Sequence, residues 1–247
     1  MASNLLIGRK PVEEALNSGK QIEKILMLKS AEGSAKKIFA IARDRNIPVA
    51  MLDKAALDKK AEGKNHQGVI AYTSEFEYAE LDDVFELARS KKEPLFVVIL
   101  DEIEDPHNLG AIMRSAHALG AHGIIIPKRR AAQVNEVVCK TAAGASEYLL
   151  CVRVANLSAT IDELKAKGVW IYASDMGAKA YYDEDLSGNI AIVVGNEGKG
   201  IGRLIKEKCD FVISIPMYGS INSLNASNAA AIIMSEAARQ RHSKNII

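Results

Sequence analysis

Cysteine is scarce in this chain and is not placed for a disulfide framework or a zinc site. The 247 residues include three cysteines, Cys139, Cys151 and Cys209, which are odd in number and far apart. Disulfide-rich domains and cysteine-ligated zinc sites need paired, closely spaced cysteines. The histidines are not paired with cysteines or carboxylates either, so we expect no bound metal. Free cysteines are typical of a protein of the reducing cytoplasm.

Long apolar runs are absent as well. The apolar stretch near the N-terminus is too short for a signal peptide, and no run approaches the ~20 residues of a membrane-spanning helix. We therefore expect a soluble, cytoplasmic protein without a membrane partner.

The net charge is only +1, but the charges are unevenly distributed. Residues 1–75 carry 13 basic and 9 acidic side chains, residues 76–95 carry 3 and 6, and residues 96–247 carry 16 of each. A basic surface attracts polyanions such as nucleic acids. An excess of four charges also arises by chance, so charge alone leaves both interpretations open.

Several common catalytic signatures are missing. The chain has no G-x-S-x-G elbow of the serine hydrolases. Its glycine-rich stretch IAIVVGNEGKGIG has a misplaced lysine and lacks the Ser or Thr of a phosphate-binding P-loop. The glycines at 195, 198, 200 and 202 also depart from the dinucleotide pattern G-x-G-x-x-G. This departure counts against a nicotinamide-dependent oxidoreductase.

The order of predicted elements indicates an α/β protein with two domains. Helices and strands alternate over residues 1–75 and predict a small α/β domain. Residues 76–95 are acidic and are interpreted as a linker with a short helix. Over residues 96–247, apolar β-branched segments alternate with helices and predict a doubly wound parallel sheet. A loop between two strands is expected at residues 176–189.

Three loops follow predicted strand ends in the second domain, where ligands bind in such sheets. The first, DPHNLGAIMRSAHALG, has Asn108 in position to cap a helix and Arg114 outside its apolar face. The second contains Glu197 in a glycine-rich turn. The third, IPMYGSINSLNASNAAAIIM, opens a helix that Ser223 is placed to cap. Its small hydrogen-bonding residues are Gly219, Ser220, Asn222, Ser223, Asn225, Ser227 and Asn228.

Each of these side chains has an ordinary structural interpretation when it is considered alone. Asn108 suits an N-cap and Arg114 suits a solvated surface, whereas an arginine near a helix N-terminus also suits a phosphate. Glu197 is either a helix-cap acid or a carboxylate that orients a cationic or hydroxyl-bearing ligand.

Taken together and in this order, the three loops resemble the motifs of the SpoU (TrmH) family of RNA ribose 2′-O-methyltransferases, in the SPOUT superfamily. The segment NHQGVIA at residues 65–71 resembles the end of the family's small RNA-binding domain, which is similar to ribosomal protein L30e. This domain arrangement is similar to that of bacterial enzymes that methylate a guanosine in 23S ribosomal RNA. Whereas the pattern alone predicts an ordinary doubly wound sheet, the resemblance implies a deep trefoil knot near the C-terminus.

The resemblance also implies a cofactor, partners and residue roles. The cofactor is S-adenosylmethionine, held in a bent conformation, and the partners are RNA and a second copy of the chain. The implied cofactor contacts are Gly195, Ile215, Met217 and Leu224. The implied catalytic residues are Asn108, Arg114, Glu197, Ser223 and Asn225. The implied RNA contacts in the first domain are Arg9, Lys10, His66 and Gln67.

The role of Arg114 and the homodimer interface each have an alternative physical explanation. Arginine stays protonated in proteins, so Arg114 is better suited to clamp a phosphate or stabilise a developing alkoxide than to take a proton. Phosphate or water would then accept the proton. The alanine-rich last helix around residues 229–233 fits a homodimer interface, and core packing explains the same residues equally well.

Three other functions stay open on the sequence. The protein could be a non-catalytic RNA-binding factor in ribosome assembly, it could methylate transfer RNA or another ribosomal site, or it could be an oxidoreductase. The N-terminal domain favours ribosomal RNA, because family members that act on transfer RNA commonly lack it.

Overall fold

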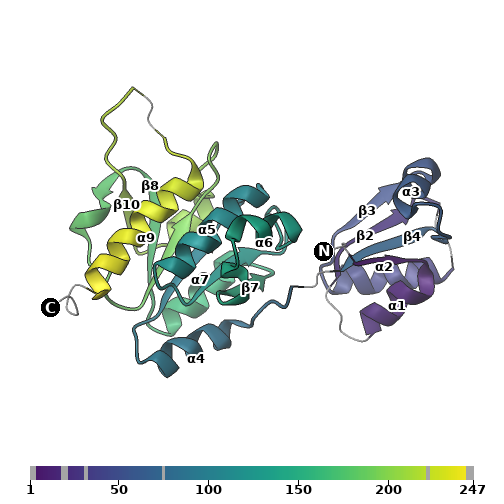
Figure 1. Cartoon of the computed structure of the whole chain (residues 1–247), viewed down its shortest axis with the longest axis horizontal. Helices are drawn as coiled ribbons and strands as arrows, with labels where there is room; N and C mark the ends of the chain where they lie inside the picture. The colour runs from purple at the N-terminus through teal and green to yellow at the C-terminus, as the bar shows by residue number, and fades with distance from the viewer. Residues whose placement is uncertain (1–3, 18–21, 31–32, 74–75, 221–222, 243–247) are drawn as a thin grey trace. The chain divides into compact units, whose positions relative to one another are not determined.

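The structure, a computed structural model, describes residues 4–17, 22–30, 33–73, 76–220 and 223–242. The chain divides into two compact units, Met1–Glu77 and Tyr78–Ile247, which are drawn in Figure 1. Each unit has its own sheet and its own core. In the described part of the chain, no helix is both long and apolar enough to cross a membrane.

The first unit is a mixed four-stranded sheet covered by helices. Its strands lie in the order β1-β4-β2-β3, with β2 and β3 parallel and the other pairs antiparallel. The elements in chain order are β1 (Asn4–Ile7), α1 (Arg9–Asn17), β2 (Ile22–Leu28), α2 (Ser34–Asp44), β3 (Val49–Leu52), α3 (Lys54–Ala61) and β4 (Val69–Thr73). Strand β1 was not expected from the sequence; it forms because it pairs with β4, a partner distant in the chain.

The second unit is a six-stranded parallel sheet in the order β10-β8-β9-β5-β6-β7. Its strands are β5 (Phe96–Leu100), β6 (Gly123–Pro127), β7 (Leu150–Val154), β8 (Trp170–Ala180), β9 (Ile190–Val194) and β10 (Phe211–Ser214). Strands β5 and β9 are buried along their whole length, as expected for central strands covered on both faces.

Helices cover both faces of this sheet (Figure 1). They are α4 (Leu81–Lys91), α5 (Pro106–Ala118), α6 (Glu136–Ala142), α7 (Leu157–Ala166), α8 (Arg203–Lys208) and α9 (Ala226–His242), with 3₁₀ turns η1 (Ala145–Glu147) and η2 (Tyr181–Asp183). Helices α4, α7 and α8 share one core cluster, whereas α5 packs against α6 and α9.

The acidic segment 76–95, interpreted as a linker with a short helix, contains the helix α4, whose Val84 and Ala88 are buried in the core of the second unit. One expectation about this unit needs revision. The expected loop at 176–189 begins later, because β8 continues to Ala180. A register shift in β10 pairs Ile213 and Ser214 with residues 179 and 180 of β8 and so extends the strand.

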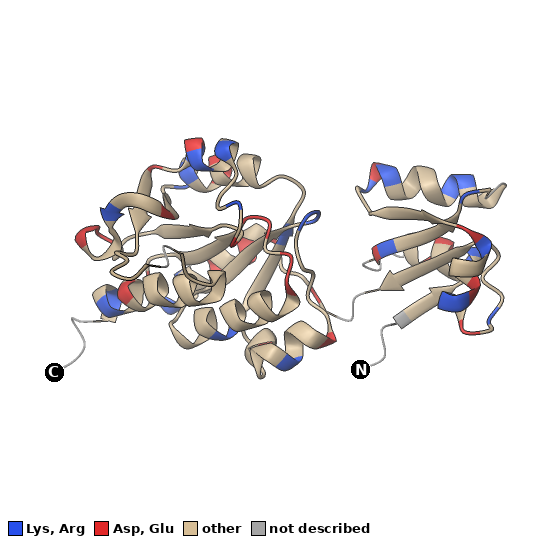
Figure 2. Ribbon diagram, turned by 90° about the horizontal axis from the view of Figure 1, so that it is seen from above, with Lys and Arg blue, Asp and Glu red and all other residues tan. Residues whose placement is uncertain are grey.

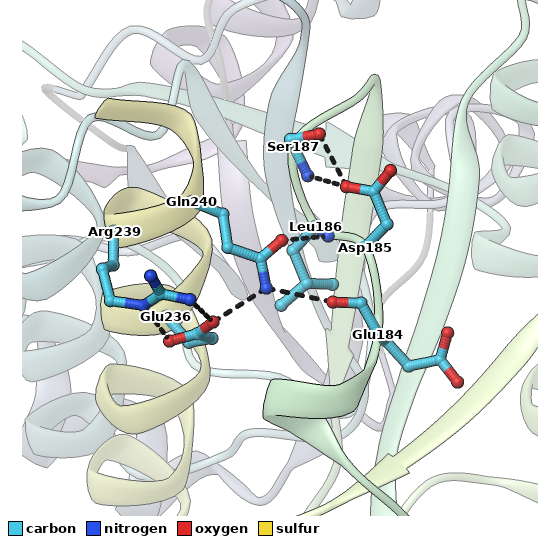
Figure 3. A network of polar contacts seen from close by, with 7 residues as sticks. All are labelled: Glu184, Asp185, Leu186, Ser187, Glu236, Arg239 and Gln240. Atoms are coloured by element: carbon cyan, nitrogen blue, oxygen red, sulfur yellow. Dashed lines mark hydrogen bonds and ion pairs between the residues drawn. The ribbon is translucent and has the colours of Figure 1, made fainter. Parts of the chain in front are cut away.

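Polar contacts attach the C-terminal helix to the connection between β8 and β9 (Figure 3). Gln240 of α9 donates to Glu184 O at 3.0 Å and accepts from Leu186 N at 2.7 Å. Glu236 accepts a further hydrogen bond from Gln240 and pairs with Arg239. These contacts hold the C-terminal part of α9 against that connection.

Candidate active site

Three neighbouring parallel strands, β10, β8 and β9, end at the same edge of the second sheet. The segments that follow them enclose a cavity of about 230 Å³. Its lining includes Ser174 and Asp175 from β8, the turn after β9, and Ile215 and Met217 after β10. The sequence rule that ligands bind beyond the carboxyl ends of strands thus identifies a real cavity here.

The turn after β9 is folded tightly onto itself around Asn196. The backbone groups of Asn196 and Gly200 exchange hydrogen bonds of 3.1 and 2.8 Å. The Asn196 side chain accepts from Gly198 N at 2.9 Å and donates to Glu102 O at 3.0 Å. A Cβ at Gly195 would lie only 2.3 Å from the carbonyl carbon of Gly200, so no larger residue fits at position 195.

Glu197, exposed at the tip of this turn, connects all three loops. Its Oε1 accepts a 2.8 Å hydrogen bond from Asn108 Nδ2 and another from Asn225 Nδ2. Ala226 N donates to the same oxygen at 3.3 Å. Asn225 also donates to Asn108 Oδ1 at 2.9 Å. Asn108, Glu197 and Asn225, which the sequence placed in different loops, therefore form one hydrogen-bonded group.

The two helix caps differ from those expected. Asp105 caps α5 by accepting from His107 N at 2.9 Å, which leaves the side chain of Asn108 free to reach Glu197. Asn225, rather than Ser223, caps α9, because its Oδ1 accepts from Ser227 N at 3.0 Å. Asn222, expected within the same polar stretch, lies outside the described residues.

The expected cofactor contacts lie on one cavity. Its walls include Gly195, Ile215, Met217 and Leu224, together with Glu197 and Ser223 from the expected catalytic set. Apolar walls with a few polar groups are typical of small-molecule sites. The apolar side chains suit a flat heteroaromatic ring, the carboxylates suit hydroxyl and cationic groups, and the tight turn at Gly195 exposes backbone to the ligand. The residues present thus fit a sulfonium nucleoside.

Arg114 does not join this group within a single chain. It lies on α5 six residues beyond Asn108, which is about 9 Å along a helix axis, and its side chain is exposed. It does not line the cavity. Among the described residues it has no hydrogen-bonding or ionic partner.

Sequence reasoning missed Asp175, which lines the cavity from the middle of β8, just beyond the strand segment 169–174 expected from the sequence. Its carboxylate accepts from Lys206 Nζ at 2.6 Å and from Met176 N at 2.7 Å. Although partial burial opposes ionisation, these two donors hold the pKa of Asp175 below its ordinary value. The same strand-end rule would have found it, since Asp175 follows an apolar strand segment.

The expected RNA contacts lie in the first unit, where two of them have internal roles. His66 is buried; its Nδ1 accepts from Gly68 N at 2.9 Å and its Nε2 lies 2.8 Å from Asp58 Oδ1. Arg9 Nε donates to Gln67 O at 2.8 Å. Lys10 and the side chain of Gln67 are exposed. In the described part of the chain, no group of three or more metal-ligating side chains is placed to hold a metal ion.

Comparisons with known proteins match both units. Residues 95–235 match the SpoU rRNA Methylase family, and residues 5–79 match the family described as RNA 2′-O ribose methyltransferase substrate binding. The chain is 45% identical over 240 residues to YacO of Bacillus subtilis (strain 168), whose name assigns it to the TrmH family of tRNA/rRNA methyltransferases. This match covers 96% of each protein.

Solved structures show the same relationship. The SpoU methyltransferase AviRb from Streptomyces viridochromogenes, in complex with AdoMet, matches with a TM-score of 0.62 and 28% identity over 97% of this chain and 90% of that one. The AdoMet-bound rRNA methyltransferase from Sinorhizobium meliloti matches with a TM-score of 0.58 and 25% identity over 95% and 86%. The expected α/β fold with its trefoil knot is that of the SpoU structures. The chain belongs to the SpoU (TrmH) family, as an RNA methyltransferase that uses S-adenosylmethionine.

Proposed function

We propose that the protein methylates a ribose 2′-hydroxyl of RNA, and that its target is a guanosine of 23S ribosomal RNA in the cytoplasm. The observation that carries the proposal is the hydrogen-bonded group Asn108–Glu197–Asn225, because Glu197 belongs both to this group and to the cofactor cavity. The match of the first unit to a substrate-binding domain of RNA 2′-O ribose methyltransferases supports the choice of the ribose.

The cofactor supplies an activated methyl group, so the protein has to align the reacting atoms and accommodate one proton. The contacts of Glu197 given above all fall on Oε1. Its Oε2 accepts no hydrogen bond from the described residues and is free to accept one from a ribose hydroxyl. Asn108 and Asn225 hold the carboxylate in place for this role, and Ser223 shapes the adjoining wall.

We assign Arg114 to the phosphate next to the target ribose, where its guanidinium would neutralise negative charge during transfer. Since Arg114 lies away from the cavity of its own chain, the proposal includes a homodimer in which Arg114 of one protomer completes the site of the other. Ala230 and Ile233 of α9 are buried in the core, so an interface formed by this helix would use its half-buried residues, such as Ile232.

The choice of ribosomal RNA rests on the first unit. The match to the rRNA methyltransferase from Sinorhizobium meliloti covers 95% of this chain, so it includes the first unit, and 86% of that protein. Within that unit, the exposed Lys10 and Gln67 and the half-buried Arg9 are the proposed RNA contacts. His66 would act indirectly, by holding the turn that presents Gln67.

Methyl transfer from labelled S-adenosylmethionine tests the proposal directly. Ribosomal RNA from cells that lack the protein is the substrate, and transfer RNA from the same cells is the comparison. We expect incorporation into 23S RNA and recovery of the label as 2′-O-methylguanosine after digestion. Label in transfer RNA, or on another nucleoside, would show that the target is not a guanosine of 23S RNA. Absence of transfer to any RNA would favour the alternative of a non-catalytic RNA-binding protein.

A further inference from the structure

A second cavity, of about 420 Å³, lies beyond the ends of β5, β6 and β7, beside the start of α8. It is formed by the segments around Glu102, Arg129 and Asn156. Lys199 and Gly200 line both this cavity and the cofactor cavity. The two cavities therefore lie on either side of the turn that carries Glu197.

Cationic side chains outnumber carboxylates in this second cavity. Its cationic lining residues are Arg129, Arg130, Lys199 and Arg203, and its acidic ones are Asp101 and Glu102. The Asp101 carboxylate accepts a 2.7 Å hydrogen bond from Gly202 N, and burial raises its pKa. Glu102 is paired with Arg130 at 3.2 Å. Four cationic side chains against two carboxylates leave an excess of two positive charges in the lining.

These cations are available to a ligand. The guanidinium of Arg129 and the ammonium group of Lys199 have no hydrogen-bonding or ionic partner among the described residues, although the backbone N–H of Lys199 donates to Asn196 Oδ1. Arg203 pairs with Glu207 at 3.0 Å, but its side chain is 89% exposed, and such surface pairs contribute little stability. Elsewhere in the second unit several lysines pair with carboxylates, as Lys206 does with Asp175 at 2.6 Å. Figure 2 marks where the basic and acidic residues fall along the ribbon.

We propose that this basic cavity binds backbone phosphates of RNA adjacent to the nucleotide that is methylated. The proposal rests on the proposed function and extends it, since Lys199 lies two residues from Glu197 on the same turn. A ribose held at Glu197 brings its flanking phosphates with it, because the phosphates are part of the same strand. Arginine suits this ligand, since its planar fork binds phosphate oxygens in pairs.

The test measures how the full-length protein binds a fluorescently labelled single-stranded RNA of mixed sequence at several salt concentrations. Each phosphate contact contributes about 0.7 to the slope of log affinity against log salt. For the double variant Arg129→Gln/Arg203→Gln we therefore expect a slope smaller by about 1.4, which lowers the affinity about 25-fold at 0.1 M salt when the two proteins bind equally at 1 M salt. Affinity for S-adenosylmethionine, measured by calorimetry, should stay within about twofold, as these arginines do not line the cofactor cavity.

Two further variants keep the test specific. Arg89→Gln removes the same charge from an exposed position on α4. Val84 of that helix lies against Gly123, at the opposite end of β6 from the cavity, so RNA binding should be unchanged. Arg129→Lys keeps the charge, so the slope of its log affinity against log salt should be closer to that of the wild type than the slope of the single variant Arg129→Gln.

An unchanged affinity and slope in the double variant would overturn the proposal. A parallel loss of S-adenosylmethionine binding would overturn it too, since it would show that the arginines support the cofactor cavity. The titration involves no methyl transfer, so its result is distinguishable from a failure of the proposed reaction in the wild-type protein.

Discussion

The amide group of Asn108 donates a 2.8 Å hydrogen bond to Glu197 Oε1 across 89 positions of the chain. The contact joins the first turn of α5 to the turn after β9, and Asn225 reaches the same oxygen from the start of α9. A carboxylate that accepts from two amide groups is held in one orientation. The geometry of the site thus depends on an acceptor that carries a full negative charge.

Replacement of Glu197 by glutamine keeps the shape of this side chain and removes its charge. We expect methyl transfer to fall by about 100-fold, within the range typical for loss of a group that assists proton transfer. S-Adenosylmethionine binding should stay within a few fold, because the cavity walls are otherwise intact. Single-turnover transfer and calorimetric titration measure the two effects. Glu86→Gln, on the exposed side of α4, is the matched control, and equal rates in both variants would contradict the role of Glu197.

Two glycines of the same turn provide a steric test. A Cβ at Gly195 meets Gly200 and Ile201 backbone atoms at 2.3–2.5 Å, whereas a Cβ at Gly198 meets only Asn196 Oδ1, at 3.6 Å. Gly195→Ala should therefore open the turn, lower the free energy of unfolding by about 1–3 kcal/mol and weaken cofactor binding at least tenfold. Gly198→Ala should unfold in urea like the wild type. Equal stability of the two variants would show that the turn adapts.

Much of the site was predictable because strand ends and small residues are local features. An apolar run that stops at glycine, serine or asparagine indicates a strand end, and parallel strands bring such ends to one edge. The strand-end pattern therefore placed the loops that carry Gly195, Glu197 and Ile215 at one edge of the second unit, where these residues line a common cavity. This pattern can be recognised without knowing which strands are neighbours in the sheet.

The partners of individual side chains were not predictable, because they depend on contacts between distant segments. The cap of α5 is a local matter, because Pro106 suits the first helical position and so makes Asp105 the cap. The partner of Asn108 is not local, since Glu197 lies 89 positions away. Asn225 likewise caps α9 with its oxygen, while its amide group donates to Glu197 in a distant loop. The extension of β8 to Ala180 likewise depends on its pairing with β10, which no local pattern contains.

We expect the buried His122 to make the stability of the second unit depend on pH. His122 Nδ1 accepts from Phe96 N at 3.1 Å, so this nitrogen has to stay unprotonated. Burial lowers the pKa of His122, and nearby Lys91 and Arg241 lower it further, against the opposing effect of Glu93. In the unfolded chain the histidine titrates near its ordinary pKa of about 6.5.

The unfolded state therefore binds more protons than the folded state between the lowered pKa and about 6.5. We expect the free energy of unfolding to be highest above pH 6.5 and to fall as the pH decreases through this window. Urea unfolding at a series of pH values measures the slope. His122→Gln removes the titrating group and keeps an oxygen that can accept from Phe96 N, so its slope should be smaller. An identical slope in this variant would assign the effect to other groups.

Arg114 and Glu197 provide a test of the shared site, because each protomer would supply one of them to a given cavity. Arg114→Ala and Glu197→Ala homodimers should both be inactive. When the two variants are unfolded and refolded together, half of the dimers combine one chain of each kind. In such a dimer one site contains both mutations and the other contains none, so about one quarter of the wild-type activity should return for a symmetric two-site dimer. If both residues acted within one chain, each site of the mixed dimer would keep one mutation and no activity would return. The activity of the refolded wild-type protein is the reference for the recovered activity. A mixture of the separately refolded variants is the control for residual activity.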